Sequence, residues 1–291
     1  MMSPLQVVSS SSPKYAQTNN LNGIRPNLVL KSSDSDLFYV HTHRLNSAST
    51  NKFQGHTAAT NDSVVDVPEN SQILTIILDI IYRNSSAAED FASPFPFDIL
   101  AAAISRLPVY GVDIQAQLNL DRSNVDPTVP AQPVFQALHS HAMSHPLQLY
   151  ILAAQYNLES LAIAASPYLL GLHITELTDE QAEAMGPVYL RRLILMQIQR
   201  EEALKKILLQ PPYPHPATPE CDVLTQKTLT RAWSVIAANF AWDIRADLPS
   251  AALERLLSSL SGYVSCGHCK SSIEEQVARI ITEWESVKVT I

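Results

Sequence analysis

The stretch DLFYVHTHRLNSAS, from Asp36 to Ser49, decides the fold class. Its first half alternates with a period of two residues and is rich in aromatic and β-branched side chains, which is typical of a half-buried strand. From His43 onward, Leu45, Ala48 and Ser49 follow the helical period instead. The sequence therefore predicts a strand that continues directly into a short helix.

Two further strands and a long helix are predicted on either side of this stretch. Asn27 to Lys31 reads as a strand, and the turn-forming residues Ser32 to Ser35 join it to the opening stretch as a hairpin. Val64 to Val67 is a third strand, and it precedes a helix from Ser71 to about Asn84. The apolar residues of that helix recur at helical spacing: Ile73, Ile76, Ile77, Ile80 and Ile81.

The rest of the chain is predicted to be helical. One helix covers Phe97 to Arg106, and from Pro133 onward there are only helices, at Val134 to Met143, Pro146 to Tyr156, Leu158 to Ser166, Pro187 to Leu209, Val223 to Asn239, Ser250 to Leu260 and Ser272 to Val287. The spacing of Ser272 and Glu275 predicts a capping box at the start of the last helix. Four aromatic residues in these helices are expected to be buried: Trp233, Phe240, Trp242 and Trp284. The fold class is α+β: a small sheet, a hairpin plus one further strand, covered by helices and followed by an all-α extension.

This order of elements resembles the BTB/POZ domain in the form found in fungal proteins. The fold signature that carries the resemblance consists of Asp34, Phe38, Val40, His41, Leu45 and Ser49, with Phe53, Val65, Pro68, Glu69 and Ile80 to Tyr82 further along. Ser49 and Phe53 are four apart, where many BTB domains place them three apart, so a rebuilt helix end is expected there. We expect a disordered polar tail over 1–24, a BTB/POZ-like domain over 25–170 and a helical region over 171–291.

Bulk properties restrict the class of protein. The chain has 291 residues, of which 46% are hydrophobic, and this composition is typical of a globular protein. Its formal net charge of −8 argues against nucleic-acid binding and against an acidic membrane surface, because both need a basic face. No signal peptide or membrane span is evident, and three cysteines cannot form a disulfide framework. An intracellular protein, cytoplasmic or nuclear, is expected.

Cys266 and Cys269, in a C-x-x-C sequence, are the sharpest chemical motif. Two thiolates three residues apart on a turn can hold one tetrahedral metal ion. Cys221 and His215 can complete a structural zinc site, with His268 as a competitor for the last position. The preferred interpretation is nevertheless that the thiols are ordinary buried residues and that no cofactor is bound, because the chain has no second C-x-x-C.

No catalytic motif accompanies these residues. His139, His141 and His145 cluster in HSHAMSH, but no H-E-x-x-H and no G-x-S-x-G occurs in the chain. His41 is interpreted as a packing and hydrogen-bonding residue at the strand–helix junction rather than as a general base. No catalytic or cofactor-binding residue is therefore assigned.

The resemblance implies a non-enzymatic protein–protein interaction module, a self-associating scaffold or adaptor that forms a homodimer through its BTB-like domain. Two alternatives stay open. One is a metal-dependent enzyme with a site built from His141, His145, Cys266 and Cys269. The other is a substrate adaptor for cullin-3 ubiquitin ligases. Such adaptors commonly carry a hydrophobic residue two positions before a glutamate, and loop 54–62 has no such pair.

Overall fold

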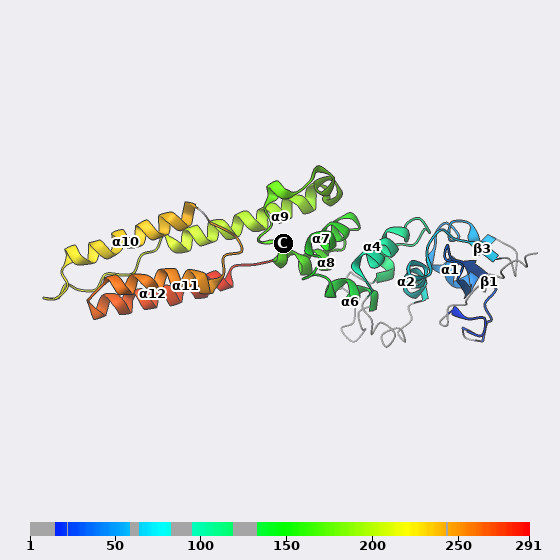
Figure 1. The fold of residues 1–291 in the computed structure, drawn as a ribbon, viewed down its shortest axis with the longest axis horizontal. Helices are drawn as coiled ribbons and strands as arrows, with labels where there is room; N and C mark the ends of the chain where they lie inside the picture. The colour runs from blue at the N-terminus through cyan, green and yellow to red at the C-terminus, as the bar shows by residue number, and fades with distance from the viewer. Residues whose placement is uncertain (1–14, 22, 59–63, 83–94, 119–132, 243) are drawn as a thin grey trace, which may run out of the picture. The chain divides into compact units, whose positions relative to one another are not determined.

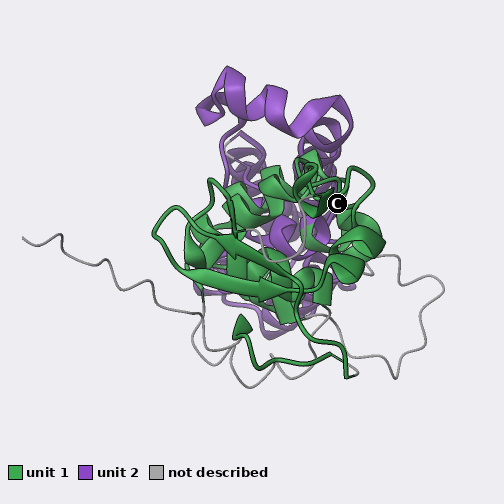
Figure 2. Cartoon of the chain, turned by 90° about the vertical axis from the view of Figure 1, so that its right-hand side faces the viewer, with its two compact units in different colours: residues 1–161 green, residues 162–291 purple. Residues whose placement is uncertain are grey.

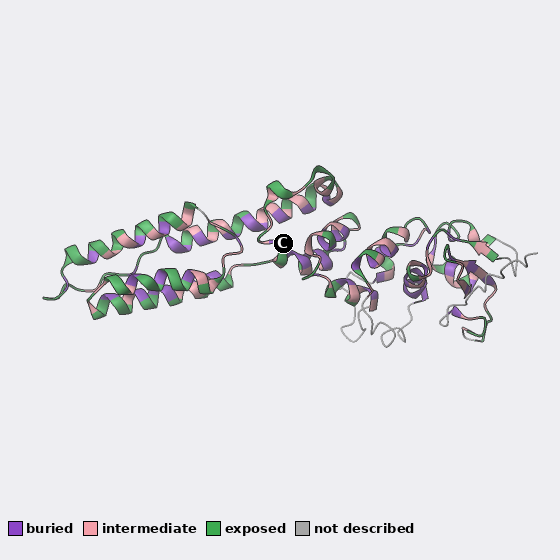
Figure 3. Cartoon of the chain, in the orientation of Figure 1, coloured by how far each residue is buried: buried purple, intermediate pink, exposed green. Residues whose placement is uncertain are grey.

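A computed structural model describes residues 15–21, 23–58, 64–82, 95–118, 133–242 and 244–291 (Figure 1). The chain divides into two compact units, residues 1–161 and residues 162–291 (Figure 2). In the helices of both units, buried residues gather along the sides that pack against neighbouring elements (Figure 3).

The first unit contains the predicted sheet. Strand β1 (Leu28–Lys31) lies in the middle, antiparallel to β2 (Leu37–Val40) and parallel to β3 (Val64–Asp66). The register pairs Leu28 with Val40 and Leu30 with Phe38, so these four side chains share one face of the sheet and all are buried. A hairpin plus one further strand is confirmed, and with it the α+β fold class.

The helices of the first unit follow the sheet. They are α1 (Thr42–Ala48), α2 (Ser71–Tyr82), α4 (Phe97–Arg106), α5 (Ile114–Leu118), α6 (Pro133–Ser140) and α7 (Pro146–Gln155). Helix α8 (Glu159–Ala165) begins in the first unit and ends in the second. Helix α2 is buried on more than the predicted stripe, because Leu74 and Leu78 are enclosed as completely as Ile76 and Ile77. The short helix α5 has no counterpart in the sequence prediction.

His41 joins the strand–helix junction to the end of α2. Its backbone N–H donates to the hydroxyl of Tyr82 at 2.7 Å, and its Nδ1 lies 3.1 Å from the same oxygen. Its Nε2 lies 3.0 Å from the carbonyl oxygen of Ile24, which can only accept. We therefore assign the proton to Nε2, so that Nδ1 accepts from the Tyr82 hydroxyl.

Asp34 and Ser49 of the fold signature also make defined contacts. Asp34 accepts hydrogen bonds from the backbone N–H of Ser71 at 2.9 Å and from its hydroxyl at 2.6 Å, at the N-terminus of α2, where a negative charge is favourable. Ser49 donates to the carbonyl of Tyr110 at 2.7 Å and accepts from the N–H of Phe53 at 2.7 Å. The backbone is left-handed at Phe53, with φ of 52°, and at its two neighbours.

Tyr15 is buried in the first unit, although it belongs to the stretch 1–24 for which a loose tail is expected. Its hydroxyl donates to Oδ1 of Asp79 at 2.6 Å, and its ring contacts Phe38 and Tyr82. A single aromatic anchor with a satisfied hydroxyl is enough to fix a polar segment. Residues 1–14 lie outside the described part of the chain.

The second unit consists mainly of helices α9 (Asp179–Leu208), α10 (Val223–Trp242), α11 (Ser250–Ser258) and α12 (Gly267–Ser286). They enclose a core that includes Leu204, Leu208, Trp233, Leu253, Leu257, Ile273, Val277 and Trp284. The two buried indoles are satisfied, since Trp233 donates to the carbonyl of Leu208 and Trp284 to that of Leu248, each at 3.0 Å. Trp242, which was expected to be buried, is 93% exposed.

One predicted helix start is wrong, and another marks a break inside a longer helix. Helix α9 begins at Asp179, behind a capping box formed by Thr178 and Gln181, and its backbone leaves the helical region at Gly186, with φ of 67°. The predicted start at Pro187 coincides with the second of the two helical segments, and the first segment is not predicted from the sequence. Helix α12 begins at Gly267, so Ser272 lies within the helix and its hydroxyl donates to the carbonyl of Tyr213 at 2.7 Å. The predicted capping box at Ser272 therefore does not exist, because helical backbone already precedes that residue.

The His41 junction predicts a pH dependence of stability. Burial lowers the pKa of His41 below its ordinary value of about 6.5. Between pH 7 and 5 the unfolded chain therefore takes up a proton that the folded junction resists, so the free energy of unfolding should fall as the pH falls. Hydrogen exchange of the α2 amides, corrected for intrinsic rates, measures this in the first unit.

The matched variant is His41→Gln. At pH 7 its free energy of unfolding should be about 1–3 kcal/mol lower than that of the wild type, because hydrogen-bond partners of His41 are left unsatisfied. Between pH 7 and 5 its free energy of unfolding should fall by less than that of the wild type. Burial also lowers the pKa of His56, which accounts for the dependence that remains. An unchanged slope in the variant would contradict the assignment of a neutral His41.

Candidate metal centre

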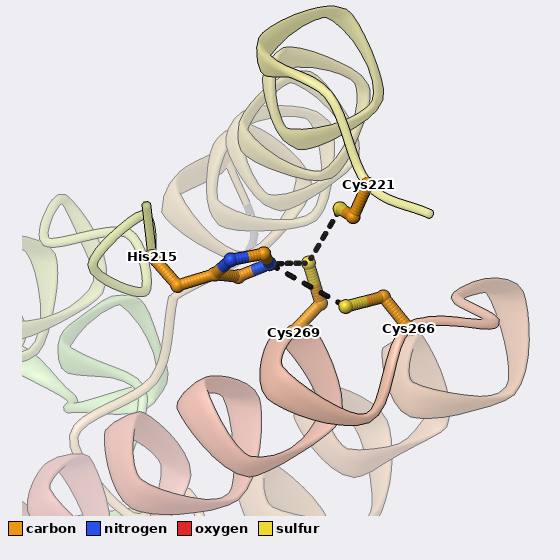
Figure 4. A group of neighbouring side chains, drawn as sticks. All are labelled: His215, Cys221, Cys266 and Cys269. Atoms are coloured by element: carbon orange, nitrogen blue, oxygen red, sulfur yellow. Dashed lines mark hydrogen bonds between the residues drawn. The ribbon is translucent and has the colours of Figure 1, made fainter. Parts of the chain in front are cut away.

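The structure brings together the four side chains that the sequence analysis named as possible zinc ligands (Figure 4). His215 and Cys221 lie in the connection between α9 and α10, whereas Cys266 and Cys269 lie at the start of α12. One ligand atom from each, the imidazole Nε2 and three Sγ atoms, falls within 4.8 Å of all the others.

Local backbone structure positions each pair. Thr218 and Cys221 exchange two backbone hydrogen bonds, at 3.0 and 3.1 Å, and so close a tight turn that presents the Cys221 sulfur. Cys266 is the residue immediately before α12 and Cys269 lies in its first turn. Residues three apart at a helix start point to the same side, so their two sulfurs converge.

The distances suit a tetrahedral ion. Sγ of Cys221 lies 3.7 Å from Sγ of Cys269, and Nε2 of His215 lies 3.4 and 3.3 Å from Sγ of Cys266 and Cys269. Zinc bonds of about 2.3 Å to sulfur and 2.0 Å to nitrogen, at tetrahedral angles, would separate two sulfurs by about 3.8 Å and sulfur from nitrogen by about 3.5 Å. The residues therefore fit zinc.

A hydrogen bond fixes the imidazole in the form that can bind a cation. Nδ1 of His215 lies 2.7 Å from the carbonyl oxygen of Pro216, so Nδ1 carries the proton and donates it. The lone pair on Nε2 then faces the thiols, which is how partners outside a metal site commonly orient a ligating histidine. His268, the predicted competitor, is exposed, and its ring lies 5.2 Å from that of His215.

The thiols differ in acidity. Hydrogen bonds, chiefly from the backbone N–H of Cys269, lower the pKa of Cys266 to about 7. The pKa of Cys269 is raised to about 12, mainly by burial and to a smaller extent by the neighbouring thiols of Cys221 and Cys266. Three thiolates would repel one another here, and a divalent cation among them would stabilise all three, because coordinating thiols are deprotonated.

The arrangement offers a closed site. Four protein ligands fill a tetrahedral shell and leave no position for water or substrate, which is the character of a structural zinc site. Sequence reasoning missed the supporting groups, the Pro216 carbonyl and the Thr218 turn. Their signal in the sequence is weak, because only the prolines around His215 mark a constrained loop.

The other histidines considered as ligands lie elsewhere. His141 and His145 belong to the first unit, and Cys266 and Cys269 to the second. Nε2 of His141 lies 3.0 Å from the carbonyl oxygen of Phe95, and the His145 ring stacks on Phe97 with centroids 5.1 Å apart. Neither unit by itself contains the four residues of the predicted enzyme site.

No protein-family model, curated protein or solved structure matches the chain. Of the helices that the structure describes, none combines the length and the apolar character needed to cross a bilayer.

The geometry predicts one zinc ion per chain. Elemental analysis of the purified protein should find it, and a His215→Ala variant should bind zinc more weakly and unfold at a lower temperature. His268→Ala is the matched control, because it removes a neighbouring imidazole that is not among the four ligands, and it should keep the metal. Full metal content in His215→Ala, or none in the wild type, would refute the assignment.

Proposed function

We propose that this chain is a non-enzymatic protein-interaction protein, intracellular, with a BTB-like unit followed by a helical unit that a structural zinc ion stabilises. The proposal gives the metal a supporting role, consistent with a closed shell of four protein ligands. The single observation that carries the interaction role is the outward face of helix α10.

Helix α10 is apolar on two sides. One side packs Trp233 and Ala237 into the core of the second unit. On the other side Leu224, Val235 and Trp242 follow one another at spacings of eleven and seven residues, so they lie along one line of the helix. Their side chains are 68%, 61% and 93% exposed.

Such a line of exposed apolar residues is typical of a protein-binding surface. Single exposed apolar residues are common, but three that are aligned on one side of a helix and include a tryptophan are less so. Tryptophan also ranks among the residues that contribute most to binding when a partner buries them. Arg231 lies on the same line and carries a charge. Its aliphatic stem can nevertheless cover apolar surface of a partner.

The proposed partners are proteins, and nucleic acid and membranes are not among them. The resemblance of the first unit to BTB domains supports a homodimer formed through that unit. For the described residues, no observation favours either alternative, a metal-dependent enzyme or an adaptor for cullin-3. Part of loop 54–62, on which the cullin-3 argument depends, lies outside the described residues.

The interaction role can be tested with two exposed aromatic residues of the second unit. Trp242 is 93% exposed and Tyr263 is 86% exposed, so replacing either by serine should leave the thermal stability nearly unchanged. Proximity labelling in the native cell should lose a set of protein partners with Trp242→Ser and retain it with Tyr263→Ser. Identical partner sets for the wild type and both variants would count against α10 as the binding surface.

Self-association can be measured separately. Light scattering should give the mass of two chains, twice 32.1 kDa, at micromolar concentration. If the BTB-like unit makes the contact, Trp242→Ser should remain a dimer. A monomeric wild type would contradict the resemblance-based expectation without affecting the α10 surface.

A further inference from the structure

A cavity of about 210 Å³ in the second unit is lined by cationic side chains from α9 and from the segment after α12. Arg192 and Arg200 come from the helix, and Lys288 comes from the C-terminal segment, with Gln199 and Thr290 as neutral polar neighbours. No aspartate or glutamate belongs to the lining. This is the reverse of the whole chain, in which 28 acidic residues outnumber 20 basic ones.

Arg200 is the central residue of this cavity. It is only 6% exposed, and its guanidinium lies over the Trp284 ring at 4.0 Å from the ring centre. Nε donates to the carbonyl of Ala246 at 2.9 Å, and Nη1 donates to that of Val287 at 2.7 Å. In the described part of the chain, no carboxylate lies within ion-pair distance of it, and Nη2 has no hydrogen-bond acceptor.

Carbonyl groups accept hydrogen bonds from Nε and Nη1 of Arg200 but do not neutralise its charge. Guanidinium stays protonated in proteins, and a buried charge without a counter-ion is costly. Burial lowers the pKa of Arg200, and no opposing effect of an anionic neighbour accompanies it. Among the described side chains, Arg200 therefore has no counter-ion, and it lies beside an open volume.

The second cation has donors to spare. Nζ of Lys288 donates to a main-chain oxygen of Ile291 at 2.7 Å, and an ammonium group has three N–H donors in all. Both side chains line the cavity, so an anion there would have two cationic donors in the same lining. Leu195 and Met196 in the same lining supply an apolar wall for the body of an organic anion.

We propose that this cavity binds the oxyanion group, phosphate or carboxylate, of a small molecule, with Arg200 and Lys288 as the principal donors and Arg192 at the rim. Binding would connect α9 to the segment that follows α12. This site is separate from the proposed metal ligands and from the exposed line on α10, so its test is independent of the proposed function.

The experiment is a titration of the full chain, followed by thermal unfolding and calorimetry. The probes are sodium phosphate and sodium acetate, each compared with chloride at equal ionic strength. Lys288→Gln removes one donor, and Lys227→Gln, an exposed residue of α10, is the matched control for the loss of one charge. Phosphate stabilises proteins in general by exclusion from their surface, but this acts equally on both variants.

The expected result is saturable binding of one anion per chain by the wild type and by Lys227→Gln. Lys288→Gln should bind about tenfold more weakly, the loss expected for one charge-assisted hydrogen bond. Preference for phosphate or for acetate identifies the class of ligand. The proposal is overturned if neither anion binds more tightly than chloride, or if the two lysine variants bind equally.

Arg200→Gln is a harsher test, because its side chain also holds two carbonyl groups in place. Arg192→Gln offers a milder second variant at the rim, and it should weaken binding without unfolding the protein. If Arg192→Gln keeps both the wild-type unfolding temperature in chloride and the full affinity for the anion, Arg192 is not part of the site. If Lys288→Gln also keeps both, the cavity is not an anion site.

Discussion

The first unit depends on the burial of helix α2, which is apolar around almost its whole circumference. Leu74 and Ile76 lie on nearly opposite faces of the helix, yet both are fully enclosed, so elements must cover the helix from several directions. Helices α1, α4 and α5 contact it, and polar contacts hold both of its ends. Asp34 occupies its N-terminus, while His41 and Arg44 bind Tyr82 at its C-terminal end.

The second unit has a different constraint, which lies in the long connection between α9 and α10. The stretch PPYPHPATPEC between α9 and α10 has no regular structure to satisfy its backbone, and much of it is exposed. His215 and Cys221 of this connection contact the cysteines at the start of α12, and these contacts fix the connection to that helix. A metal ion there would contribute folding free energy directly, because the unfolded chain has no preformed site.

The candidate metal ligands and the outward side of α10 are consistent with one proposed function. A tetrahedral ion held by all four ligands would have no open coordination position for a reacting molecule. Trp242 and Leu224, by contrast, present apolar surface without a partner in the described chain, and protein binding would remove it from water. The cationic cavity is the proposed site for a small oxyanion, because no described side chain supplies a counter-ion for the buried guanidinium of Arg200.

The sequence by itself determined the features that depend on local periodicity and on residue chemistry. The bounds of α4, the hairpin and the third strand follow from spacing alone, and the identity of the four possible metal ligands follows from the affinity of thiolate and imidazole for zinc. Tertiary structure decided the rest. Tyr15 is anchored by an aspartate 64 residues away, and the carbonyl that orients His215 is invisible to any pattern of side chains. Trp233 and Trp242 lie on the same helix, yet one is buried and the other exposed, because burial depends on which neighbours pack against each face and not on the residue itself.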